Sequence, residues 1–272
     1  MKKTRKIVYL CTESNAKCFL GLKEILVDGW NVTLVIAYKP STENARNSSF
    51  KHQLKGSIKT LLHKQPTLYL FLRKLTSREI VQNFNIEKLC SDYCIPYKST
   101  SEKSLLSMMS DMTNIAPDVI LSNGWQFKIS NEIISMARLI ALNCHSSYLP
   151  EYRGGNVTFA PLINEETETG VTVHQLVDKF DAGAILAQER VTIQSGETPQ
   201  SLNMKRAAIT GRVLIDALEI AGHPELYKSN PPSPFYFRCN YATFRRFKRI
   251  NRIRKLIGLP IMRYEPKERY DI

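Results

Sequence analysis

Short apolar runs and an amphipathic segment alternate near the N-terminus, and this alternation predicts an α/β fold. Residues 6–10 and 31–37 are rich in β-branched and other apolar side chains, which is typical of strands. Between them, after a possible helix cap at Ser14 or Asn15, apolar residues recur at helical spacing (Phe19, Leu22, Ile25 and Leu26). A strand, a helix and a second strand in this order predict a parallel sheet with right-handed crossovers.

The same alternation continues along the chain. We expect further strands at residues 95–97, 118–122, 139–142, 171–176 and 184–193, and helices at 85–93, 101–111 and 199–221. Two of the strands, 118–122 and 139–142, are continuously apolar, as in central strands that are buried on both faces. On the last helix, Arg206 and Arg212 are expected to be solvated. The predicted fold class is α/β, a Rossmann-like, mostly parallel twisted sheet with flanking helices over residues 1–222.

Residues 39–84 resemble an insertion in this pattern. Apolar residues fall at helical spacing with lysines between them (Phe50, Leu54, Ile58, Leu61 and Leu62). A solvated helix covered by lysines is the favoured interpretation, ahead of a binding surface. Pro66 ends this segment, and residues 68–75 are apolar enough to form either a helix or a strand.

The C-terminal residues 223–272 form a predicted basic extension. Residues 238–272 hold eleven Lys and Arg against three acids, a net +8 out of +13 for the whole chain, which favours anionic partners. A stiff proline-rich linker at 230–234 precedes apolar residues that recur every third position (Tyr241, Phe244, Phe247, Ile250 and Ile253). This spacing spirals around a helix by about 60° per step, which argues against a helix lying on a membrane. The alternatives for this tail are that it docks on a protein surface, that it binds a polyanion, or that it binds the diphosphate of the substrate.

Composition narrows the class of protein. At 272 residues and 43% hydrophobic content, the chain is long and apolar enough for a sizeable core. Of its six cysteines, Cys90 and Cys94 are four apart without a second pair, so we expect reduced thiols and no metal site. The apolar core of the N-terminus, residues 7–11, is shorter than a signal peptide needs, and no stretch approaches a membrane span. We therefore expect a cytoplasmic protein. No GxGxxG motif is present, which excludes the dinucleotide-binding fingerprint.

Polar side chains follow the apolar strand at 139–142. Asn143 and His145 are two residues apart, so in an extended segment they point to the same side. Open α/β sheets bind their ligands at the carboxyl ends of strands. The strand at 171–176 leads into a turn that carries Asp178 and Asp181, and this turn can bring Asp181 back to His145. An amide, an imidazole and a carboxylate would then meet without a metal.

The surrounding residues resemble a known enzyme family. They comprise Asn143-x-His145-x-Ser147-x-Leu149-Pro150-x-x-Arg153-Gly154, Thr169-Gly170-Val171-Thr172-Val173-His174 and Phe180-Asp181-Ala182-Gly183. This pattern resembles the formyltransferases that use N10-formyltetrahydrofolate, a family that includes glycinamide ribonucleotide transformylase, methionyl-tRNA formyltransferase and N-formyltransferases of nucleotide-linked amino sugars. The likeness is strong over residues 118–206 and loose over 1–117.

The resemblance implies roles for these residues. Asn143 would donate to the oxyanion, His145 would accept the proton of the amine, and Asp181 would orient His145 or stabilise its charged form. Donor-binding residues would follow two strand ends (Ser122, Asn123, Gly124, Trp125 and Gln126; Asp178 and Phe180). Trp125 is equally compatible with a wall of the pocket and with the core. Ser147, Arg153 and Gly154 would bind the acceptor substrate. Arg153 and Gly154 would shape the loop on that side, with Arg153 anchoring backbone or a substrate phosphate.

Other readings of these residues are weaker. A packed, hydrogen-bonded His174 is favoured over a catalytic one because apolar residues flank it in the strand. A serine hydrolase built on Ser146 or Ser147 lacks the GxSxG elbow. A zinc site built from His145, His174 and Asp181 lacks suitable spacing.

The proposed acceptor is the primary amine of a nucleotide-linked 4-amino-deoxysugar. Only about 50 residues follow the catalytic fold, too few for the complete C-terminal barrel of the tRNA enzyme, while the glycinamide ribonucleotide enzyme does not need the two extensions. Both of those acceptors remain alternatives. A rival of another class is a basic nucleic-acid-binding protein on a formyltransferase scaffold, although we expect no stable nucleic-acid partner. A homodimer stays open.

Overall fold

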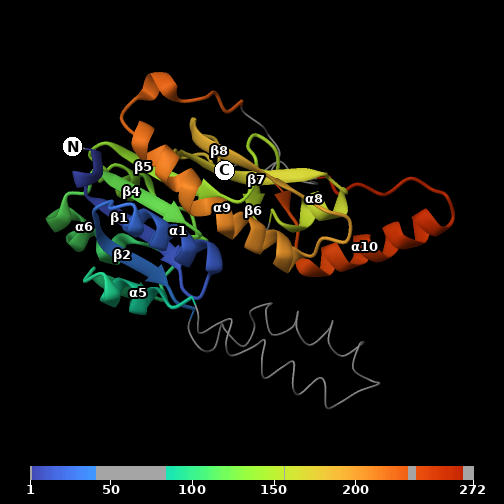
Figure 1. The fold of residues 1–272 in the computed structure, drawn as a ribbon, viewed down its shortest axis with the longest axis horizontal. Helices are drawn as coiled ribbons and strands as arrows, with labels where there is room; N and C mark the ends of the chain where they lie inside the picture. The colour runs from blue at the N-terminus through green and yellow to red at the C-terminus, as the bar shows by residue number, and fades with distance from the viewer. Residues whose placement is uncertain (1, 41–83, 156, 232–236, 266–272) are drawn as a thin grey trace, which may run out of the picture.

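The computed structural model describes residues 2–40, 84–155, 157–231 and 237–265 (Figure 1). Its centre is a seven-stranded sheet in the order β3-β2-β1-β4-β5-β7-β8. The strands are β1 (Ile7–Thr12), β2 (Val32–Tyr38), β3 (Tyr97–Thr100), β4 (Val119–Asn123), β5 (Ile140–His145), β7 (Glu168–Gln175) and β8 (Ile185–Thr192). Strands β1 to β5 are parallel, whereas β7 is antiparallel to both β5 and β8. The predicted class, a mostly parallel Rossmann-like sheet, is confirmed.

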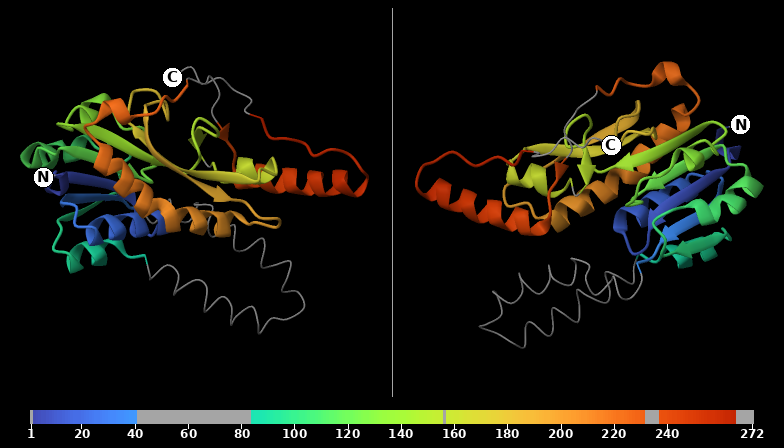
Figure 2. Two further views of the ribbon diagram at one scale, coloured as in Figure 1. Left: turned by 45° about the horizontal axis from the view of Figure 1, so that its top comes forward. Right: turned by 180° about the vertical axis from the view of Figure 1, so that it is seen from behind.

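Helices cover both faces of this sheet (Figures 1 and 2). They are α1 (Ala16–Val27), α5 (Ile86–Asp92), α6 (Met109–Ile115), α7 (Asn131–Ile134), α8 (Phe159–Ile163), α9 (Pro199–Ile220) and α10 (Tyr241–Leu256), with 3₁₀ turns at Lys2–Thr4, Leu106–Met108 and Pro224–Leu226. Helix α1 begins as expected, because the Asn15 side chain accepts hydrogen bonds from the backbone of Lys17 and Cys18. In the described part of the chain, none of the helices combines the length and the apolar composition needed to cross a bilayer.

The period of two in each strand divides its side chains between two cores. On one face, Tyr9, Leu121, Leu142 and Val173 pack with the helices α1, α5 and α9. On the other face, alternate residues such as Leu10, Ile120 and Ala141 pack with α6 and α7. Asn143 and His145 follow Ala141 in steps of two, so they project from the α6 and α7 face, at the carboxyl end of β5.

A third core lies beside the sheet and includes the C-terminal residues. Helix α10 packs on α8, where the rings of Phe244 and Phe159 lie 5.3 Å apart. Just before α10, the short strand β9 (Phe237–Arg238) pairs with β6 (Gly154–Gly155). Strand β9 and helix α10 therefore contact the body beside the loop that follows β5. The domain boundary at 222/223 stays a prediction.

Three sequence expectations differ from the structure. The strand expected at 95–97 lies at Tyr97–Thr100. The helix expected at 101–111 is displaced to Leu106–Ile115, where a 3₁₀ turn leads into α6. Arg206 was expected in solvent but is 1% exposed, because α9 turns this position toward β7, and the prediction for it is wrong. Arg212 on the same helix is largely exposed and pairs with Glu189, as a solvated position does. Most of the predicted insertion at 39–84 lies outside the described residues.

Candidate active site

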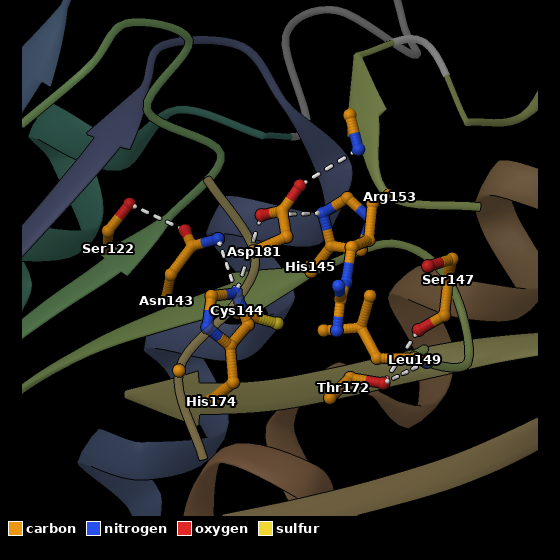
Figure 3. A network of polar contacts seen from close by, with 12 residues as sticks. Ser122, Asn143, Cys144, His145, Ser147, Leu149, Arg153, Thr172, His174 and Asp181 are labelled. Carbon is orange, nitrogen blue, oxygen red and sulfur yellow. Dashed lines mark hydrogen bonds and ion pairs between the residues drawn. The ribbon is translucent and has the colours of Figure 1, made fainter. Parts of the chain in front are cut away.

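The polar residues at the end of β5 meet those of its two neighbouring strands. Parallel pairing places Asn143 opposite Ser122 of β4, and antiparallel pairing places Asn143 opposite His174 of β7. The same pairing sets His145 opposite Thr172. Since the antiparallel neighbour shares the face of Asn143, an amide and two imidazoles are brought together (Figure 3).

The amide of Asn143 is held in one orientation. The Ser122 hydroxyl donates to its Oδ1 at 3.0 Å, and its Nδ2 lies 3.2 Å from His174 Nε2. His174 Nδ1 in turn contacts the carbonyl oxygen of Gln175 at 2.9 Å, so this nitrogen carries the proton and Nε2 accepts from the amide. An NH₂ group has two hydrogens, so one remains to donate to a ligand.

His145 lies between a carboxylate and a backbone carbonyl. Its Nδ1 is 3.4 Å from Asp181 Oδ1, and its Nε2 is 3.1 Å from the carbonyl oxygen of Tyr152. Burial lowers the pKa of His145 below its ordinary value, although the nearby Asp181 carboxylate opposes that shift. The ring is therefore neutral near pH 7 and can accept a proton.

The Asp181 carboxylate lies beside both imidazoles of the site. One carboxylate oxygen lies 3.4 Å from both His145 Nδ1 and His174 Nε2, and the other accepts the backbone N–H of Gly154 at 2.9 Å. Burial raises the pKa of Asp181, but the two imidazoles and the N–H bond outweigh burial and hold the pKa well below its ordinary value. Asp181 remains ionised and occupies a left-handed conformation with φ of 49°.

His174 is both a packed residue and a member of this cluster. It is 1% exposed and hydrogen-bonded, as its apolar neighbours in the sequence predicted. It also contacts Asn143 and Asp181 directly, which the sequence reasoning missed. The sequence does show that His174 and Thr172, two residues apart, lie on the same face of their strand. Only the register of β7 against β5 shows that this face meets Asn143.

A second residue that the sequence reasoning missed is Asn230, at the start of the proline-rich linker. Its side-chain NH₂ donates to the carbonyl oxygens of Asp181 and Gly183, at 3.0 and 2.8 Å. Its Oδ1 accepts from the guanidinium of Arg153, which also donates to the Pro231 carbonyl at 2.6 Å. Asn230 thus ties the turn that carries Asp181 to the loop after β5. No motif in the sequence marks it.

The predicted acceptor-side residues are mostly engaged by the chain itself. Ser147 is fully buried and donates to the carbonyl of Glu151, and Arg153 is 1% exposed and holds the linker. Gly154 contributes its N–H to Asp181. These three residues therefore hold the loop beside His145, and their contact with substrate stays a prediction.

The five residues predicted after β4 divide between the two faces. Ser122 faces Asn143, whereas Asn123 points to the opposite face and donates to Tyr9 and to the backbone of Lys17. Gly124 has φ of +84°, and an added Cβ would meet the sulfur of Cys18 at 2.6 Å.

Beyond Gly124 the chain leaves the strand. Trp125 packs edge-on against Tyr38 and Phe127 and is 8% exposed, so the structure places it in the core rather than along an open wall. Gln126 and Phe127 line a hollow of about 440 Å³ together with Lys103 and Lys128.

The second predicted donor segment lies beside the first. Lys128 Nζ and Asp178 Oδ1 form an ion pair of 3.0 Å between the loop after β4 and the turn after β7. Phe180 in this turn is 39% exposed. Gly183 closes the turn against β7, where an added Cβ would lie 2.0 Å from the Gln175 carbonyl oxygen. Within the described ranges, no group of three His, Cys, Asp or Glu side chains is arranged to hold a metal ion.

Comparison with known proteins bears on the family and the fold. The profile of a family described as formyl transferase matches residues 27–218. Phosphoribosylglycinamide formyltransferase from Bacillus halodurans is similar in structure, with a TM-score of 0.56 and 17% identity over 82% of this chain and 99% of that one.

Two further solved structures share the fold. The corresponding enzyme from Coxiella burnetii has a TM-score of 0.55 and 20% identity over 84% of this chain and 91% of its own. A formyltetrahydrofolate deformylase from Pseudomonas putida has a TM-score of 0.53 and 18% identity over 83% of this chain and 67% of its own. At these identities the likeness establishes the fold, and the family match covers the greater part of the chain.

Proposed function

Because the chain belongs to the formyl transferase family and transfers a formyl group from N10-formyltetrahydrofolate, we propose that its acceptor is the primary amine of a nucleotide-linked 4-amino-deoxysugar. The observation that carries the formyl-transfer chemistry is the contact of a neutral His145 with an ionised Asp181 beside the Asn143 amide. These groups match the needs of acyl transfer to an amine: a base, an electrostatic partner for it and a donor for a developing oxyanion.

Each residue has a distinct part in the proposed mechanism. N10-formyltetrahydrofolate supplies the formyl carbon, whose bond to N10 is exchanged for a bond to the acceptor nitrogen. His145 accepts the proton that the amine loses, and Asp181 stabilises the resulting imidazolium. The free N–H of Asn143 donates to the carbonyl oxygen as its negative charge grows, an interaction worth about 3–4 kcal/mol in comparable sites. The proton then passes from His145 to the departing N10.

The residues at two strand ends fit the donor. The hollow beside Gln126 has an aromatic side chain, Phe127, and two lysines, Lys103 and Lys128, which suit the aromatic ring and the carboxylates of a folate. Since β4 is the neighbour of β5, a donor bound along the loop after β4 would present its formyl group toward Asn143. Donor binding through Gln126 can be tested by the affinity for a folate analogue in Gln126→Ala.

The acceptor side supports a substrate larger than a simple amine. The Bacillus halodurans structure is matched over 99% of its length yet accounts for 82% of this chain, so this chain has additional segments. Two parts of the chain beyond the family match contact the loop after β5: Asn230 binds Arg153, and strand β9 pairs with β6. Lys17 also reaches this edge, where its Nζ lies 3.0 Å from Ser146 Oγ, and it offers a positive charge to a phosphate.

Glycinamide ribonucleotide is the second candidate acceptor, since the enzymes named above for that substrate share the fold. A panel experiment separates the candidates. The protein is incubated with the formyl donor and with amino-sugar nucleotides, glycinamide ribonucleotide or methionyl-tRNA, and each product is examined by mass spectrometry for an added formyl group. Formylation of glycinamide ribonucleotide without that of any amino-sugar nucleotide would refute the proposed acceptor, and His145→Ala serves as the inactive control.

A further inference from the structure

Helix α10 has two unlike faces. Phe244 and Asn251 are buried and Phe247 is half-buried, and this inner face packs on α8. The opposite side carries six exposed residues, which we call the outer face of α10 (Arg245, Arg246, Arg249, Arg252, Ile253 and Leu256). At 100° per residue these six positions fall within about 120° of one another around the helix axis, so they form one continuous surface.

The positive charge of the outer face is not compensated. The helix sequence YATFRRFKRINRIRKL has seven Lys and Arg and no acid. The nearby carboxylates Glu165 and Glu166 pair with Lys255 and Arg263, which lie off the outer face. Throughout the described ranges, none of the four outer-face arginines forms an ion pair with a carboxylate. They are available to an anionic partner.

Aliphatic side chains accompany these arginines at the end of the helix. Ile253 and Leu256 are 50% and 79% exposed, and they continue into Ile257 and Leu259, which are 65% and 46% exposed. Solvent-exposed apolar residues that cluster in this way mark interaction sites rather than random surface. This apolar tip adjoins the arginines of the outer face.

The tip is held in a defined position away from the sheet. Figures 1 and 2 show α10 extending beyond the body, with the chain turning at its end and returning. The returning segment is fastened by Asn251, which exchanges hydrogen bonds with the backbone of Met262, and by Asn164, which does the same with Tyr264. The outer face and the tip therefore form a supported projection that can reach a flat surface.

We propose that the outer face of α10 and its apolar tip bind the surface of an anionic lipid bilayer. Arginine guanidinium groups bind lipid phosphates, and aliphatic side chains beside them enter the boundary between headgroups and acyl chains. A second copy of this chain would bring the same four arginines together, and their repulsion disfavours self-association through this face. Nucleic acid would use the arginines but would leave the aliphatic tip unused, since single strands bind through aromatic stacking and Phe244 and Phe247 face α8.

The structure also explains why the three-residue spacing argued against such binding. The apolar positions do spiral, but the helix divides them between two uses. Phe244 and Phe247 fill the core against α8, and Ile253 begins the exposed tip. The exposed apolar residues are therefore contiguous only at the end of the helix, where Leu256 joins Ile253.

Vesicle co-sedimentation of the full-length protein tests the proposal without any enzyme substrate. The probes are vesicles of phosphatidylcholine alone and of phosphatidylcholine with about 30% phosphatidylglycerol. We expect binding to the anionic vesicles and not to the neutral ones, and weaker binding as salt rises from about 50 to about 500 mM. Equal binding to both kinds of vesicle, or to neither, would overturn the proposal.

Paired variants separate the two parts of the surface. Each arginine should contribute about fivefold to partitioning onto anionic vesicles. Arg245→Glu/Arg249→Glu should therefore lower this partitioning at least about 25-fold, and the neutral pair Arg245→Gln/Arg249→Gln should lower it less. Ile253→Ser/Leu256→Ser, which keeps every charge, should lose about tenfold. All of these side chains are exposed, so the thermal unfolding temperature should not change.

A charge-matched control lies on other helices. Lys23→Glu/Lys88→Glu makes the same change in net charge on exposed positions of α1 and α5, and should retain binding within about threefold. If the control loses as much as the arginine pair, the effect is general electrostatics and the proposal is wrong. If Ile253→Ser/Leu256→Ser binds vesicles as the wild type does, while polyuridylic acid is bound through the arginines, the partner is a nucleic acid and not a bilayer.

Discussion

Asn230 offers a sharp test of how the site is held together, because its side chain serves two segments at once. Its NH₂ donates to the carbonyl oxygens of Asp181 and Gly183, and its Oδ1 accepts from Arg153. Asn230→Asp is nearly the same size and keeps an acceptor for Arg153, but it removes both donors and sets a carboxylate against two carbonyl oxygens. Asn230→Ala removes all three interactions.

The magnitude follows from the bonds lost. Two neutral hydrogen bonds contribute about 1 kcal/mol each and the bond to a guanidinium contributes about 2 kcal/mol. Asn230→Ala should therefore lower the free energy of unfolding by at most about 4 kcal/mol. Because Asn230 is half-buried, water replaces part of this, and about 2–3 kcal/mol is the expected loss. Asp181 has a left-handed backbone, so its carboxylate shifts from His145 once the turn is released. If half of this free energy is also lost from the stabilisation of the transition state for formyl transfer, kcat falls roughly tenfold.

The assay is steady-state formyl transfer with the acceptor identified by the panel, together with thermal unfolding. In Asn230→Asp we expect kcat to fall about 10- to 100-fold, while KM for the donor changes less than threefold, or about 0.7 kcal/mol. Asn31→Ala is the matched control, since Asn31 also donates from its side chain to a backbone carbonyl, that of Thr4, but far from the site. Wild-type kcat in both Asn230 variants would refute the role of this residue in positioning Asp181.

Three further outcomes are expected. Burial lowers the pKa of His145 below 6.5 and Asp181 opposes that shift, so Asp181→Asn should move the acid limb of kcat/KM to lower pH while reducing kcat by orders of magnitude; an upward shift contradicts the assignment. Burial lowers the pKa of Arg206 to about 9, so Arg206→Met should change the unfolding free energy in urea by no more than about 1 kcal/mol, whereas Arg206→Ala should cost about 3 kcal/mol. Truncation after Asn230 should uncover the ring of Phe159 and lower solubility without removing the contact of His145 with Asp181, as light scattering and activity would show; a monodisperse, active truncate that has lost RNA binding would contradict this.

Local patterns in the sequence were enough to predict the sheet and two of the site residues, Asn143 and His145. Strand periodicity depends on neighbouring side chains alone, which is why the central strands β4 and β5 and the long helix from Pro199 were predicted close to their observed bounds, whereas the short strand expected at 95–97 lies at Tyr97–Thr100. The helix cap at Asn15 is likewise a matter of adjacent residues. The placement of Asn143 and His145 on one side of β5 follows from their separation by two residues.

Tertiary structure decided which distant groups complete the site. His174 joins Asn143 because β7 runs antiparallel to β5 in one register, and a shift by a single residue would turn its ring to the other face. Register of this kind depends on contacts between segments far apart in the chain, which no local pattern encodes.

The same reason applies to the residues whose surroundings were misjudged or missed. Arg206 has an ordinary helical neighbourhood in the sequence, yet the packing of α9 against β7 buries it beside Thr169. Asn230 follows the catalytic fold along the chain and returns to Asp181 only because Asn230 and Pro231 are bound by Arg153 of the loop after β5. The sequence by itself therefore determined the fold class and the kind of chemistry, while long-range packing determined which side chains hold the reacting groups in place.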